Sequence, residues 1–146
     1  MVKEARLRIL VVGCGSIGTR HLRAFKRIEG VEVIPCDPRK DVLKKIVENY
    51  NLAEVYKDIK EVNLERIDAM VICTPPHTHI SIALGGAKAN CHLLIEKPIS
   101  NKLDEIEELI QLTKKKRLVL GVAYCLRYHP IGDKERLQEL GGLSNP

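Results

Sequence analysis

Short apolar runs alternate with amphipathic segments along the whole chain, and this alternation predicts an α/β fold. The runs have strand length, and several are apolar enough to be covered on both faces. They occupy residues 7–12, 31–36, 54–57, 69–73, 91–95 and 118–122. We therefore expect a doubly wound parallel sheet (a Rossmann fold) of six strands, in the order 3-2-1-4-5-6.

Apolar positions with helical spacing fill the intervals between these runs. In the first interval one helix face carries Ile17, His21, Ala24, Phe25 and Ile28. We expect this face to pack on the sheet, with His21 as a satisfied core histidine and Gly30 ending the helix. Later helical stripes fall within 42–50, 80–87 and 103–110.

The length of 146 residues fits one domain. We expect residues 1–130 to form it and residues 131–146 to be a flexible polar tail. No apolar run approaches the roughly 20 residues that span a bilayer, and the first residues lack the pattern of a signal peptide. We expect a soluble, cytoplasmic protein.

Charge and cysteine usage narrow the function classes. The chain has 24 Lys and Arg against 19 Asp and Glu, spread over several segments, with only four Tyr and one Phe. This favours a solvated mixed-charge surface over a nucleic-acid-binding one, because platforms for base stacking are lacking. The five cysteines form no C-x-x-C pair, which argues against a metal site or a disulfide framework.

A glycine-rich turn follows the first predicted strand and opens the first predicted helix. Residues 13–18 read G-x-G-x-x-G. Gly13 permits a tight turn, Gly15 lets a pyrophosphate approach the backbone, and Gly18 allows close helix–strand packing. The start of the helix then offers amide groups to an anion. The alternative is a glycine turn that merely joins strand to helix.

Asp37 ends the second predicted strand, 19 residues beyond Gly18, near the spacing expected of the acid that binds a ribose diol. A carboxylate there repels a 2′-phosphate and favours NAD over NADP. Arg39 and Lys40 follow and could instead receive that phosphate, so NADP stays open. The simpler interpretation of Asp37 with Pro38 is a turn.

Further polar residues follow the fourth and fifth strands, at the edge where doubly wound sheets bind ligands. Thr74 and Pro75 end the fourth strand, and His77 and His79 come next. The i, i+2 spacing of these histidines suits a metal poorly, and a neutral imidazole capping or lining the crevice is the better interpretation.

Lys97 lies between Glu96 and Pro98 at the mouth of the fifth strand. Beside a nicotinamide, burial could lower the pKa of this lysine and let it hold or deprotonate a substrate hydroxyl. Pro98 restricts Lys97 to extended geometry and could support a cis peptide bond. A surface lysine at a strand end is the alternative.

Together these motifs resemble the Gfo/Idh/MocA oxidoreductase family, which includes glucose–fructose oxidoreductase, inositol dehydrogenase and many sugar dehydrogenases. The resemblance covers residues 7–130, including a hinge-like segment at 125–130. It implies a nicotinamide cofactor bound by Gly13, Gly15, Ser16, Ile17, Gly18 and Asp37. It also implies contacts along the dinucleotide from Thr74, Pro75 and His79, in a T-P-x-x-x-H motif. Glu96 and Lys97 match an E-K-P motif whose lysine lies near the nicotinamide and the reacting hydroxyl, and Arg127 and Tyr128 fall where some members touch substrate.

Members of that family continue for about as many residues again, as a second domain that supplies most substrate contacts. We therefore expect the dinucleotide-binding half of a sugar or polyol dehydrogenase, incomplete for catalysis alone, that transfers hydride between a secondary alcohol and the nicotinamide. A separate substrate-domain chain, or a homo-oligomer, would cover the apolar surface near the last strand. The alternatives are a stand-alone nucleotide-binding or sensing module and a structural subunit.

Overall fold

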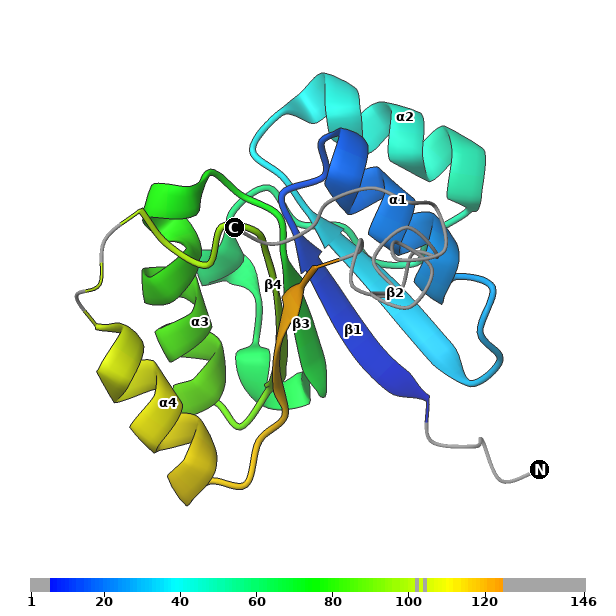
Figure 1. Ribbon diagram of the computed structural model, residues 1–146. Helices are drawn as coiled ribbons and strands as arrows, with labels where there is room; N and C mark the ends of the chain where they lie inside the picture. Colours follow the sequence, from blue (N-terminus) through cyan, green and yellow to red (C-terminus); the bar gives the residue numbers. More distant parts are fainter. Residues whose placement is uncertain (1–5, 102, 104, 125–146) are drawn as a thin grey trace, which may run out of the picture.

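A single parallel sheet forms the centre of the computed structural model, which describes residues 6–101, 103 and 105–124 (Figure 1). Its strands within these residues are β1 (Leu7–Val12), β2 (Val31–Cys36), β3 (Ala69–Ile72), β4 (His92–Glu96) and β5 (Leu120–Ala123). They lie in the order β2-β1-β3-β4-β5, and every neighbouring pair is parallel. The predicted fold class, a doubly wound α/β sheet, is confirmed.

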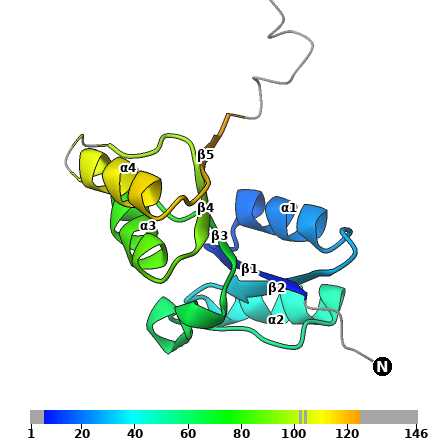
Figure 2. The ribbon, with the colours of Figure 1, turned by 90° about the horizontal axis from the view of Figure 1, so that it is seen from below.

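Helices cover both faces of this sheet. They are α1 (Ser16–Phe25), α2 (Lys40–Tyr50), α3 (His79–Lys88) and α4 (Ile106–Lys115), with short 3₁₀ turns η1 (Ile59–Glu61), η2 (Leu64–Arg66) and η3 (Pro76–Thr78). Figures 1 and 2 show α3 and α4 stacked together on one side of the sheet. None of the helices in the described part of the chain is long and apolar enough to cross a membrane.

The strands separate two apolar cores because their side chains alternate between the faces. Ile9 and Val11 of β1 join one core with Leu22 of α1 and Ile46 of α2. The other core lies toward α3 and α4, and its largest fully buried side chains are Leu10, Ile34, Met70, Ile72, Ile95 and Leu109. Both faces of the central strands are buried, as continuous apolar runs predict.

The expected third strand, at residues 54–57, is a single bridge. Tyr56 pairs with Cys36, accepting the Asp37 amide at 3.1 Å and donating to the Pro35 carbonyl at 3.0 Å. The next rung would need an N–H from Pro35, which proline lacks, so the pairing stops there. The predicted count of six strands is therefore wrong for the described residues. The remaining five lie in the predicted relative order, with bounds within two residues of those expected.

The buried face of α1 also differs from the predicted stripe. Gly18 and Leu22 are its buried residues, whereas Ile17 and Ile28 are 42% and 51% exposed. Gly18 has no side chain, so hydrophobic periodicity alone misses this position, at which the helix packs closely against Gly13 and Cys73. Because α1 packs through Gly18 and Leu22, His21 is only partly buried, and its side chain contacts Glu96 at the end of β4.

Several predictions concern residues outside the described ranges. They are the tail at 131–146, the domain boundary at 130, the hinge-like segment at 125–130, and the positions of Arg127 and Tyr128.

Candidate functional site

The glycine turn packs tightly against the end of β3. Gly13 has a φ of +85°, and a Cβ built on it would lie 2.7 Å from the Cys73 carbonyl oxygen. A Cβ on Gly18 would lie only 1.9 Å from the Gly13 carbonyl oxygen. Real Cβ atoms do not approach backbone so closely, so the fold itself requires glycine at both positions.

Gly15 is different, because the space beside it is open. The nearest atom to a Cβ built there is the Arg39 guanidinium, at 3.8 Å. Gly15 is also the N-cap of α1, and no side chain caps this helix. The exposed first turn, with Ser16 and Ile17, therefore presents amide groups and the positive end of the helix dipole to an outside acceptor. This arrangement fits a pyrophosphate, which needs close backbone approach and several N–H donors.

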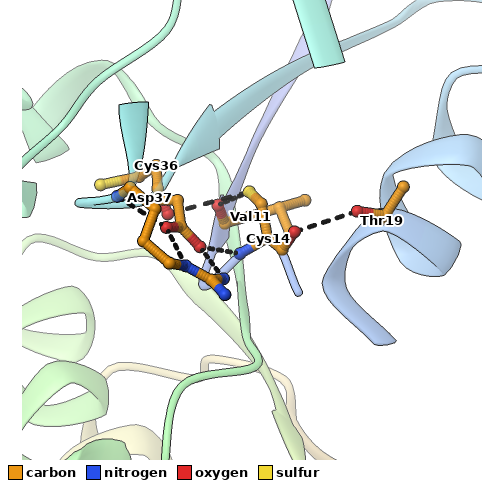
Figure 3. A network of polar contacts seen from close by, with 6 residues as sticks. Val11, Cys14, Thr19, Cys36 and Asp37 are labelled. Carbon is orange, nitrogen blue, oxygen red and sulfur yellow. Dashed lines mark hydrogen bonds and ion pairs between the residues drawn. The ribbon is translucent and has the colours of Figure 1, made fainter. Parts of the chain in front are cut away.

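Asp37 joins the glycine turn to the end of β2 (Figure 3). It is 1% exposed, and its Oδ2 accepts the Cys14 amide at 2.8 Å. Arg39 donates to the same carboxylate three times, through its backbone amide and Nε to Oδ1, each at 2.9 Å, and through Nη2 to Oδ2 at 2.8 Å. The acid thus holds the turn in place and is itself held by Arg39.

These contacts keep Asp37 ionised. Burial of the carboxyl raises its pKa, but the hydrogen bonds from Arg39 and from the Cys14 amide together lower the pKa by more, so it lies below the ordinary value of 3.8. A carboxylate has about four acceptor positions, and all four are in use. A ribose diol would therefore have to displace the Arg39 guanidinium, whose side chain is 55% exposed.

The cysteines near the turn remain protonated thiols. Burial raises the pKa of Cys14, Cys36 and Cys73 to about 12 in each case. These three and Cys91 are all free of disulfides. Within residues 6–101, 103 and 105–124, no three side chains of His, Cys, Asp or Glu gather as a metal site would require.

A hollow of about 610 Å³ opens at the carboxyl ends of β3, β4 and β5, on the side of α1. Its lining includes four predicted site residues: Ile17, Thr74, Glu96 and Lys97. The other lining residues are Arg20, His21, Cys73, Leu94, Gly121, Val122, Ala123 and Tyr124. A second hollow, of about 440 Å³, lies toward the amino ends of the strands and contains none of the predicted residues. The position of the first matches the general rule for ligands in doubly wound sheets.

Lys97 lies at this hollow with its side chain exposed. The described residues therefore do not provide the burial that the sequence-based hypothesis invoked for it. Its peptide bond to Pro98 is cis, one of the geometries that the sequence left open. The neighbouring Glu96 carboxylate accepts the Lys97 amide at 3.2 Å through Oε2 and contacts His21 Nε2 at 2.7 Å through Oε1.

The His21–Glu96 contact was missed by the sequence analysis, which placed His21 in the core. The helical spacing held the relevant signal, because His21 lies one turn after Ile17. That residue belongs to the exposed face of α1 beside the glycine turn. Residues on this face point toward the hollow rather than into the core.

His79 connects the two loops that border the hollow. It is 1% exposed, with Nε2 at 2.7 Å from the Thr74 carbonyl oxygen and Nδ1 at 3.0 Å from that of Pro98. A carbonyl oxygen only accepts, so a neutral ring donates to one of them and a doubly protonated ring to both. In this structure His79 touches the loops, whereas Pro75 and part of Thr74 are accessible.

Comparison with known proteins identifies the class of this domain. The family model for the Gfo/Idh/MocA oxidoreductase family, NAD-binding Rossmann fold, matches residues 7–124. The chain belongs to this family, and the described domain is its NAD-binding Rossmann domain, in agreement with the resemblance seen in the sequence.

Individual relatives are dehydrogenases of much greater length. Myo-inositol 2-dehydrogenase from Thermotoga maritima is 32% identical over 124 residues, which are 84% of this chain and 37% of the relative. The crystal structure of a probable dehydrogenase from the same organism superposes with a TM-score of 0.80 at 32% identity, covering 96% of this chain and 43% of that one. The structure of UDP-N-acetylglucosamine 3-dehydrogenase from Acidithiobacillus ferrooxidans superposes with a TM-score of 0.75 at 26% identity. The superposition covers 93% of this chain and 43% of that one. The chain spans about two fifths of the length of such relatives.

Proposed function

We propose that this chain binds NAD(H) with the pyrophosphate against the start of α1. The observation that carries the proposal is the contrast among the three glycines. Backbone atoms occupy the space that a side chain on Gly13 or Gly18 would need, whereas Gly15 faces open space beside the uncapped amides of α1. A turn that served only to join strand to helix would need Gly13 and Gly18 but not Gly15.

The adenosine ribose then lies at Asp37. We propose that the diol binds by displacing the half-exposed guanidinium of Arg39 from the carboxylate, since Asp37 itself is fixed by the Cys14 amide. The displaced guanidinium would lie beside the position of a 2′-phosphate and would pair with that phosphate. The site would therefore also accept NADP, but more weakly than NAD. Arg39→Gln should strengthen NADH binding and weaken NADPH binding, each by a few fold. Lys45→Ala, an exposed change on α2, is the control.

The nicotinamide would extend into the hollow at the ends of β3, β4 and β5. When bound, it supplies the hydride acceptor for oxidation of a secondary alcohol. We propose that Lys97, which lines this hollow, holds the alcohol oxygen and exchanges its proton. Thr74 and Pro75 would border the dinucleotide, and His79 would support them by fixing both loops. We propose a sugar or polyol as the substrate class, because the relatives named above act on an inositol and on a sugar nucleotide.

A titration followed by NADH fluorescence tests the binding proposal. Saturable binding of one NADH per chain, with weaker binding of NADPH, is the expected result. Absence of saturable binding by either dinucleotide would remove the proposal. ADP-ribose, which lacks the nicotinamide, should compete and should bind less tightly than NADH.

The hollow also supports the expected assembly, as a complex with a substrate-domain chain or as a homo-oligomer in the cytoplasm. Tyr124 is 56% exposed at its edge, and apolar residues of β5 line it. Such a surface favours a partner. Light scattering that shows only a monomer at high protein concentration would count against the homo-oligomer.

A further inference from the structure

A side-chain contact joins the helix that begins at the glycine turn to the strand that carries Lys97. His21 of α1 places Nε2 at 2.7 Å from Oε1 of Glu96, at the end of β4. Both side chains are largely shielded, with 23% and 16% exposed. Phe25 lies one turn along α1 and stacks on the imidazole, with 6.5 Å between ring centroids and 24° between planes. Phe25 thus helps to fix the orientation of the His21 ring, and in that orientation Nε2 contacts Glu96.

The second carboxylate oxygen of Glu96 reaches the backbone of Lys97. Oε2 accepts the Lys97 amide at 3.2 Å. On the far side of the lysine, the Pro98 carbonyl oxygen lies 3.0 Å from Nδ1 of His79. The backbone around Lys97 is therefore contacted by the Glu96 carboxylate, which His21 of α1 holds, and by the imidazole of His79 of α3. The lysine side chain itself is exposed at the hollow.

We infer that His21 is a positioning residue that orients Lys97 through the Glu96 carboxylate. The inference rests on the proposed function, since the lysine that His21 would orient is the one proposed to lie beside the nicotinamide. A flexible lysine on a free loop would lose conformational entropy each time it engaged a ligand. A carboxylate fixed from α1 removes part of that freedom beforehand.

Two probes separate this role from a merely structural one. NADH reaches both ends of the site, whereas ADP-ribose stops before the nicotinamide. In His21→Leu we expect the affinity for NADH to fall roughly three- to tenfold and that for ADP-ribose to stay within about twofold, measured by calorimetry with the full chain. Arg23→Leu changes an exposed residue of the same helix and should alter neither affinity. Equal losses for both probes, or no loss for either, would overturn the inference.

Conservative variants keep the test decisive if His21→Leu folds poorly. His21→Gln retains an N–H donor of similar reach and should recover most of the NADH affinity. Glu96→Leu should show the same selective loss as His21→Leu, and the double variant should lose no more than either alone. Additive losses would contradict the inference. A wild-type chain that binds neither probe would remove the proposed function as well, whereas binding of both probes with unselective variants would remove only the role of His21.

Discussion

The candidate site has two halves, one for the pyrophosphate and one for the nicotinamide, and they differ in the kind of groups that form them. The phosphate half consists of backbone groups in close contact, with Gly13 against the Cys73 carbonyl, Gly18 against Gly13, and the buried Asp37 on the Cys14 amide. The nicotinamide half consists of side chains around a hollow of about 610 Å³, and its contacts join residues far apart in the chain, such as His21 and Glu96. The first half is therefore fixed by backbone packing, whereas the second depends on contacts between side chains.

The largest effect expected in the phosphate half comes from Gly18→Ala. Its Cβ would overlap the Gly13 carbonyl oxygen, so the helix must move away from the turn, at a cost of about 4 kcal/mol of unfolding free energy. Gly85→Ala is the matched control, because a Cβ in that part of α3 meets nothing within 4 Å and should stabilise the helix by about 0.5–1 kcal/mol. Urea denaturation measures both; similar values for the two variants would show that the turn yields easily.

In the nicotinamide half, His79→Leu should cost about 3 kcal/mol. It leaves the carbonyl oxygens of Thr74 and Pro98 without the ring that now contacts them, in a place with little access for water. The same denaturation experiment applies. A change below about 1 kcal/mol would indicate that water replaces the ring, and that the two loops do not depend on it.

A smaller effect, with a distinctive pH dependence, is expected for Asp37→Asn. The pKa of Asp37 is lower in the folded chain than in the unfolded one, so its contribution is fully present above the unfolded value of about 4 and is lost as the pH falls through the folded value. The variant should lose about 2 kcal/mol at pH 7 and progressively less below pH 4. A loss independent of pH between 7 and 3 would contradict an ionised Asp37.

Most of the fold and the phosphate half could be predicted from the sequence because their signals are local. The glycine spacing follows directly after a buried strand, and Asp37 ends the next one, so adjacent motifs bring both to one edge of the sheet. The E-K-P and T-P-x-x-x-H motifs likewise predicted that the ends of β4 and β3 would border the candidate site.

The remaining features depend on contacts that no local motif records. The bridge at Tyr56 is short because a proline on the neighbouring strand lacks an N–H. The face of α1 that packs on the sheet is centred on Gly18, which contributes no hydrophobicity to the pattern. The engagement of Asp37 by Arg39 involves a residue predicted only as a possible phosphate ligand. The first two are decided by geometry between separate elements, and the third by the conformation of a guanidinium side chain only two residues from Asp37.

Gly15 provides the most direct test of nucleotide binding at this turn. An alanine there meets only the Arg39 guanidinium at 3.8 Å, so the unfolding free energy should fall by no more than about 1 kcal/mol, because alanine is a poorer N-cap than glycine. The new methyl group would nevertheless occupy the approach of the pyrophosphate. Parallel NADH titrations of the wild-type chain and Gly15→Ala should show an affinity loss of at least about tenfold, in a protein that stays folded. Equal NADH affinity in the two proteins would contradict the account.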